Sequence, residues 1–162
     1  MTDLLLRAAE PSDVELLVDF IRELAEFEAF PFPVTVSADD LRANLFGPAP
    51  AAQALVGEVG GRPAAFAVFY ETFSTTTGRR GLHLDDLFVR PAFQGQGHGR
   101  AILRHLAAHA QARGCARFEW WSLRTNEPAI RFYQSLGVRQ VEELLVFRAQ
   151  GDDLRRLADR TR

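Results

Sequence analysis

The sequence predicts one α/β domain, in which a mixed sheet is flanked by helices. Three observations predict it. Strand-like and helix-like segments follow one another along nearly all of the 162 residues. Hydrophobic residues make up 47% of the chain and charged residues 25%, as in ordinary globular proteins. No linker or internal repeat interrupts the chain, whose length suits a single domain, so we place that domain at residues 1–162.

The first third of the chain predicts a strand followed by two helices. Leu4–Leu6 is a short apolar run typical of a strand. Ser12–Glu15 reads as a capping box, and apolar residues at helical spacing extend the helix to about Glu28. A second, weaker box at Ser37–Asp40 opens a short helix that Gly47 ends.

The middle of the chain predicts three strands. Ala54–Val59 and Ala64–Tyr70 flank Gly60-Gly61, which is the pattern of a β-hairpin. A polar loop over Ser74–Gly81 leads to a third strand, Leu82–Val89, which contains two aspartates.

The last third predicts two helices around a strand, followed by the end of the sheet. Apolar spacing over 102–110 indicates a helix, and Arg117–Leu123 a strand. Glu127–Leu136 is a second helix, because Gly137 occupies the favoured C-terminal capping position. The remaining expected segments are strands at Val138–Val141 and Leu144–Arg148 and a small helix at Asp152–Ala158.

Charge and composition exclude several classes of function. The net charge of −2 gives no electrostatic case for nucleic acid. No apolar run is long enough to cross a membrane, and the N-terminus lacks the features of a signal peptide. Cys115 is the single cysteine, so no internal disulfide can form, and we expect a cytoplasmic protein.

The segment Gln94–Arg100 contains three glycines, follows a predicted strand and opens a helix. Glycines allow close backbone approach and positive φ, and a helix N-terminus attracts anions, so the turn suits a phosphate group. A P-loop is excluded because the chain has no lysine. A dinucleotide-binding turn does not fit its mid-chain position. A purely structural glycine turn is the alternative.

The residues Gln94, Gly97 and Gly99 form a Gln-x-x-Gly-x-Gly pattern. Together with residues 22–28, 84–89 and 126–133, it resembles the GNAT acetyltransferase superfamily. Within that superfamily, the chain is most similar to diamine acetyltransferases of the spermidine/spermine type and to their thialysine-acetylating relatives. The resemblance implies a GNAT-like fold with a bent, mostly antiparallel mixed sheet, splayed near its middle around acetyl-CoA, and no metal.

The resemblance also implies which residues hold acetyl-CoA. Backbone groups of Leu87 and Val89 would hold the pantetheine arm, and amides of 95–100 the pyrophosphate. The full implied set is Leu87, Phe88, Val89, Gln94, Gly95, Gln96, Gly97, His98, Gly99, Arg100, Asn126, Pro128 and Ala129.

Acetyl transfer to an amine requires two proton movements. An alkylammonium has a pKa of about 10.4, so a carboxylate must receive its proton, directly or through water. By resemblance this is Asp85, which is shorter than the glutamate of relatives and therefore favours a water relay. We expect neighbouring Asp86 to point to the opposite face of the strand, in a structural role. Tyr133 matches the family's proton donor to the thiolate, and a packed aromatic is the alternative.

Acidic residues near the site would attract a cationic acceptor. The resemblance points to Phe27, Glu28, Asp85 and, more loosely, Glu142, and solvated surface charge is the alternative for the two glutamates. We expect transfer to a primary amine of a polyamine, a diamine or a lysine-like amino acid, by direct attack in a ternary complex. A protein or antibiotic amine and a CoA-binding sensor without turnover are the competing functions. The family makes a homodimer possible.

Overall fold

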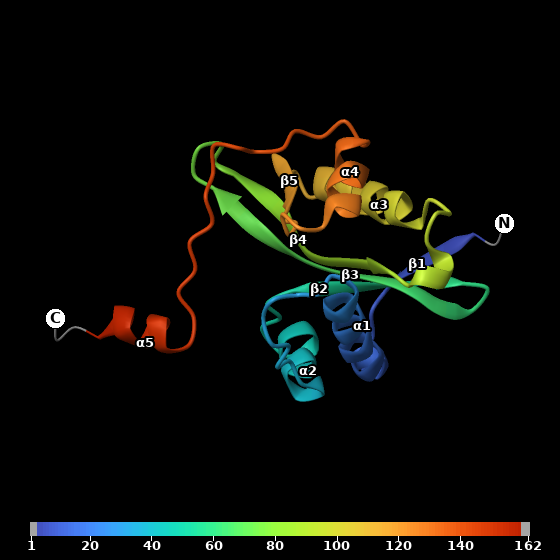
Figure 1. Ribbon diagram of the computed structural model, residues 1–162, viewed down its shortest axis with the longest axis horizontal. Coiled ribbons are helices and arrows are strands. Elements are labelled where there is room, and N and C mark those ends of the chain that lie inside the picture. The colour runs from blue at the N-terminus through green and yellow to red at the C-terminus, as the bar shows by residue number, and fades with distance from the viewer. Residues whose placement is uncertain (1–2, 160–162) are drawn as a thin grey trace. The chain divides into compact units, whose positions relative to one another are not determined.

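The computed structural model describes residues 3–159, and its internal contacts group into two compact units, Met1–Trp121 and Ser122–Arg162 (Figure 1). The first unit contains the sheet and three α-helices. The second contains α4 (Glu127–Gln134) and α5 (Asp152–Ala158). No helix of the described residues is long and apolar enough to cross a membrane.

The sheet has five strands in the order β1-β2-β3-β4-β5. The pairings β1–β2, β2–β3 and β3–β4 are antiparallel, and β4–β5 is parallel. The predicted α/β class and the mixed, mostly antiparallel sheet are therefore confirmed. The five strands are β1 (Leu4–Ala8), β2 (Gln53–Val59), β3 (Arg62–Ser74), β4 (Arg79–Val89) and β5 (Arg117–Trp120).

Helices cover both faces of this sheet (Figure 1). The helices α1 (Val14–Phe27) and α2 (Ala38–Phe46) lie on one face, and α3 (His98–Ala112) lies on the other. A short 3₁₀ turn, Pro91–Phe93, leads from β4 toward α3, which then returns the chain to β5. This crossover makes β5 parallel to β4, because α3 carries the chain back to the end of the sheet at which β4 begins.

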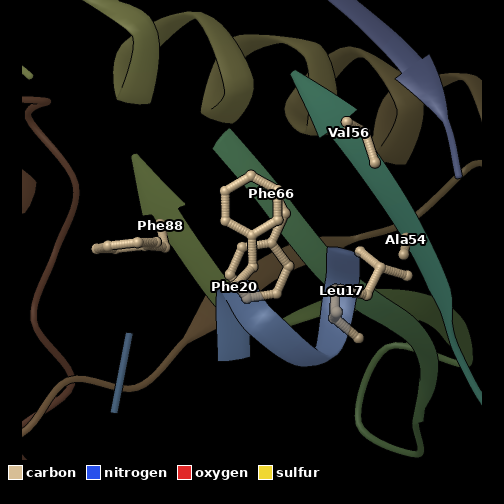
Figure 2. Close-up of a cluster of buried hydrophobic side chains, with 7 residues drawn as sticks. Leu17, Phe20, Ala54, Val56, Phe66 and Phe88 are labelled. Carbon is tan, nitrogen blue, oxygen red and sulfur yellow. The ribbon is translucent and has the colours of Figure 1, made fainter. Parts of the chain in front are cut away.

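The apolar side of α1 packs on β2, β3 and β4 (Figure 2). The ring of Phe20 stacks on Phe66 with centroids 5.1 Å apart and lies edge-on to Phe88 at 6.5 Å. The buried members of this cluster are Leu17, Phe20, Ala54, Val56, Phe66, Val68 and Phe88. This packing fixes the C-terminal end of α1 beside β4.

The expected capping box at Ser12–Glu15 is wrong. Asp13 is the residue that folds back, and its Oδ2 accepts the backbone N–H of Glu10 at 2.8 Å. Arg7 of β1 donates to both carboxylate oxygens of Asp13, at 2.7 and 2.9 Å, so an interaction from outside the helix selects Asp13. A 3₁₀ turn, Pro11–Asp13, therefore precedes α1.

The second expected box, at Ser37, is confirmed. The Ser37 Oγ accepts the Asp40 N–H at 3.2 Å, and Asp40 Oδ2 accepts the Ser37 N–H at 2.9 Å. Both residues are exposed, so this box depends on local hydrogen bonds alone.

The predicted strands at 138–141 and 144–148 are not strands in the structure. A strand needs a hydrogen-bonded partner, and residues 122–159 of the second unit contain no strand to provide one. Large apolar side chains in this segment are exposed, namely Val138, Val141, Leu144, Leu145, Val146 and Phe147. The predicted helix at Asp152–Ala158 is confirmed as α5.

Candidate active site

The glycine-rich turn lies at the N-terminus of α3. Gly95 and Gly97 have φ of +74° and +83°, a backbone conformation that favours glycine. A Cβ built at either glycine would meet nothing within 4 Å, so the space beside the turn is open. The first N–H groups of a helix have no partner within the helix and carry partial positive charge. The turn therefore fits an anionic group such as a pyrophosphate.

The side chains of the turn are held back toward the protein. Gln94 Nε2 donates to the Val89 carbonyl at 2.8 Å, and Gln96 Nε2 donates to the Ala92 carbonyl at 3.4 Å. The ring of His98 is buried, and its Nε2 has no hydrogen-bond partner among the described residues. With these three side chains turned toward the protein, the turn offers its backbone N–H groups, and Gly99 and Arg100 follow in the first turn of α3.

Strand β4 is paired on both sides only in its first half. Its residues Gly81–Leu84 pair with Arg117–Trp120 of β5, whereas residues 85–89 pair only with β3. Among residues 3–159, no strand continues the sheet beside 85–89. An extended ligand can add to such a free strand edge through main-chain hydrogen bonds. The expected backbone sites at Leu87 and Val89 lie on this stretch, together with the buried Phe88.

A β-bulge lies at the point where β4 loses its β5 partner. Val68 of β3 faces Asp86, and the next residue, Phe69, faces Leu84, so Asp85 has no partner across the ladder. Residues directly opposite each other share a face of the sheet. Asp86 therefore lies on the α1 face with Val68, whereas Leu84 and Phe69 lie on the face covered by α3.

Strict alternation is interrupted in this part of β4, because the bulge places Leu84 and Asp86, two residues apart, on opposite faces of the sheet. That Asp85 and Asp86 point to opposite faces stays a prediction. Burial raises the pKa of both Asp86 and Tyr70, and the negative charge of the exposed Asp85 raises both further. At Asp86, burial acts with the charges of Asp85 and Glu28 to raise the pKa to about 7.

Phe27 and Glu28, the expected acceptor-binding residues, lie at the C-terminal end of α1. The exposed ring of Phe27 is 5.7 Å from that of Phe88, centroid to centroid. Glu28 is the C-cap of α1, and its charge acts on Asp86. The first unit thus brings Phe27, Glu28 and Asp86 together on the α1 face of β4, and the charge of the exposed Asp85 acts on Asp86 as well.

Three further side chains on this side of the sheet belong to no sequence motif. Tyr70 and His83 are cross-strand partners with ring centroids 5.0 Å apart. The ring of Trp121 lies 4.9 Å from His83, edge to face. Only the pairing register reveals this group, because Tyr70 and His83 come from different strands.

The remaining expected residues belong to the second unit. Asn126 caps α4, and its Oδ1 accepts the Ala129 N–H at 3.2 Å, with Pro128 in the first turn of the helix. Tyr133 lies in α4 with its ring 5.3 Å from that of Phe132, and Glu142 lies in a turn. The site roles of these residues stay predictions from the sequence motif. Within 3–159, no three His, Cys, Asp or Glu residues are grouped as metal ligands.

Comparison with known proteins finds the same family along most of the chain. The acetyltransferase (GNAT) family profile matches residues 19–138. The thialysine N-epsilon-acetyltransferase of Mus musculus is 36% identical over 96% of this chain and 97% of that protein. The human spermidine/spermine N(1)-acetyltransferase-like protein 1 is 31% identical over 82% of this chain and 20% of that protein.

A solved structure shows the same fold. The integron cassette protein from the V. cholerae mobile metagenome superposes with a TM-score of 0.79 over 98% of both chains, at 24% sequence identity. The free edge of β4 and the glycine turn therefore lie in a fold shared with this distant protein.

Proposed function

The chain belongs to the acetyltransferase (GNAT) family and is an acyl-CoA-dependent N-acetyltransferase, and we propose that it transfers the acetyl group of acetyl-CoA to a primary amine of a small molecule. The amine attacks the thioester directly while both substrates are bound, and residues 1–162 act as one catalytic domain. The observation that carries the proposal is the near full-length similarity to thialysine N-epsilon-acetyltransferases.

We place acetyl-CoA along the free half of β4 and against the turn before α3. Backbone groups of Leu87 and Val89 would bind the pantetheine arm. The N–H groups of residues 95–100 would bind the pyrophosphate. This arrangement is supported by the absence of a pairing strand beside 85–89 in the described chain and by the open space at Gly95 and Gly97.

The acceptor would enter on the α1 face of β4. A protonated amine carries positive charge, and the carboxylates of Glu28, Asp85 and Asp86 provide the opposite charge there. The aromatic ring of Phe27 would contact the aliphatic part of the acceptor. Bound acetyl-CoA supplies the activated acetyl group. A carboxylate of β4 accepts the proton of the amine, a role that the motif gives to Asp85. Tyr133 donates a proton to the departing sulfur.

Among acceptors, we favour a lysine-like amino acid over a polyamine or a diamine. The name of the relatives that span nearly the whole chain refers to thialysine, an amino acid with a side-chain amine. The spermidine/spermine-type relative is 31% identical over a smaller share of the chain. A homodimer and a cytoplasmic location remain predictions from the sequence.

The test is release of free CoA thiol from acetyl-CoA by the purified protein in the presence of single amines. The panel comprises lysine, thialysine, putrescine, spermidine, spermine, an aminoglycoside and a lysine-containing peptide. We expect kcat/KM to be highest for lysine or thialysine, and Nε-acetyl-lysine, whose side-chain amine is blocked, to be inactive. A preference for the aminoglycoside or the peptide would replace the small-molecule proposal. No release with any amine, despite tight acetyl-CoA binding, would favour a sensor.

A further inference from the structure

Two neighbouring aspartates on β4 have different surroundings. Asp85 is the unpaired residue of the bulge and is exposed, whereas Asp86 returns to the ladder opposite Val68 and is partly buried. Val68 belongs to the apolar cluster beneath α1, so the Asp86 carboxyl lies beside buried hydrocarbon. A carboxyl group in such a place is less hydrated than an exposed one.

The charged and titratable groups around Asp86 come from three elements. Glu28 faces it from the end of α1, and Asp85 and His83 lie near it on β4. Tyr70 shares this face from β3, opposite His83. Arg90, which packs over Phe20 of α1, is already bound by Glu23 at 2.6 and 2.8 Å.

No ion pair of the described residues involves Asp86, and each charge that acts on it strongly is negative. Such a carboxylate binds a proton more readily than one in water, since burial and negative neighbours both disfavour its charged form. An arriving ammonium group would supply the missing positive charge. The site therefore attracts the acceptor and its proton at the same carboxyl.

Resting on the proposed function, we propose that Asp86, rather than Asp85, accepts the proton of the acceptor amine, directly or through one water. The ammonium loses one proton to the Asp86 carboxylate and becomes the neutral nucleophile. As the C–N bond forms and the C–S bond breaks, Tyr133 donates its proton to the departing sulfur. The second proton lost from nitrogen then restores the Tyr133 hydroxyl. Asp86 then releases its proton to solvent. Asp85 and Glu28 act as positioning residues that strengthen the proton affinity of Asp86.

The pH dependence gives a signature for this assignment. Because the pKa of Asp86 is raised to about 7, kcat/KM for the amine should fall as the pH drops below about 7. Replacing Asp85 or Glu28 with a neutral amide removes a negative neighbour, which lowers the pKa of Asp86. The acidic limb of the profile should then move to lower pH in Asp85→Asn and in Glu28→Gln.

The decisive comparison is Asp86→Asn against Asp85→Asn over pH 5.5–9. We expect Asp86→Asn to lose the acidic limb and about 100- to 10,000-fold in kcat/KM. Asp85→Asn should keep the limb at lower pH. Asp39→Asn on exposed α2 is the control and should match the wild type. If Asp85→Asn abolishes the limb and Asp86→Asn retains it, Asp85 is the proton acceptor and the inference is wrong.

A second measurement needs no turnover. In wild-type protein labelled with ¹³C-aspartate, the carboxyl signal absent from Asp86→Asn should titrate near pH 7, and lower in Asp85→Asn. A signal that titrates near pH 4 would overturn the inference. Absence of turnover by the wild type with every amine would overturn the proposed function and this inference with it. Normal turnover with an unchanged limb in Asp86→Asn would overturn the inference alone.

Discussion

The hydroxyl of Tyr133 is the group that we expect to deliver a proton to the departing sulfur. A thiolate leaves more easily when it is protonated as the bond breaks. We expect Tyr133→Phe to lower kcat about 10- to 1,000-fold while the Kd of acetyl-CoA stays the same, because the ring and its packing remain. Steady-state kinetics and calorimetric titration with acetyl-CoA measure the two quantities.

The matched control for Tyr133 is Ser135→Ala, which removes a hydroxyl from the C-cap of the same helix. The Ser135 Oγ donates to the Phe132 carbonyl of the same helix. Its loss should leave kcat unchanged. Equal kcat values for Tyr133→Phe and the wild type would show that Tyr133 only packs in α4.

Gly97 combines a positive φ with a position at the N-terminus of α3. Alanine costs about 1–2 kcal/mol at positive φ, and its methyl group would occupy the open space beside the turn. We expect Gly97→Ala to raise the KM for acetyl-CoA at least several-fold. Gly78, in the turn between β3 and β4, also has positive φ and open space, so Gly78→Ala should lose similar stability with an unchanged KM. An equal KM in both variants would exclude the turn from acetyl-CoA binding.

At the scale of elements, local sequence patterns predict most of the sheet and its helices. The hairpin around Gly60-Gly61 and the helices after Ser37 and after the glycine turn follow from turn residues and apolar spacing. These signals act within a few residues, so they are visible in the chain itself. The glycine turn was recognisable for the same reason.

Elements that depend on distant partners were not predictable in this way. The bulge at Asp85 is set by the pairing of β4 with β3, and it interrupts strict alternation there. The segments at 138–141 and 144–148 have strand-like composition but no strand partner within their unit. The grouping of Glu28 with Asp86 likewise required the packing of α1 on the sheet.

The start of α1 allows a test of whether the local residue Ser12 or the contact of Asp13 with Arg7 of β1 stabilises this end of the helix. Asp13→Asn removes the charge that Arg7 binds and should lower the free energy of unfolding by about 1–3 kcal/mol at pH 7. Ser12 is exposed, so Ser12→Ala should change it by less than about 0.5 kcal/mol. Urea unfolding followed by circular dichroism measures both. Equal effects would restore Ser12 as the cap.

The stability difference between the wild type and Asp13→Asn has a defined pH dependence. Hydrogen bonds from Arg7 lower the pKa of Asp13 in the folded protein. A lowered pKa contributes stability above the unfolded-state value of about 3.9, and this stability is lost as the pH falls through the folded-state value. The difference between the wild type and Asp13→Asn should therefore be constant from pH 5 to 7 and shrink below about pH 4.

At the scale of the whole molecule, two of the features that we assign to acetyl-CoA belong to the first unit. The free edge of β4 and the turn before α3 are both built on the five-stranded sheet. Since both exist only when the sheet and α3 are folded, binding there must stabilise the folded state. Ligand affinity and global stability are thus coupled in this protein.

We therefore expect acetyl-CoA to raise the melting temperature with the logarithm of its concentration. At 100 times the Kd, the folded state gains about 2.7 kcal/mol, which corresponds to about 5–11 °C for a chain of this length. Acetyl-pantetheine at the same concentration should give a smaller shift, because it lacks the pyrophosphate that the α3 turn would bind. In Gly97→Ala the two ligands should give nearly equal shifts, whereas Gly78→Ala should behave like the wild type. Equal shifts by both ligands in the wild type would show that the turn contributes no binding energy, and the pyrophosphate would then have to lie elsewhere.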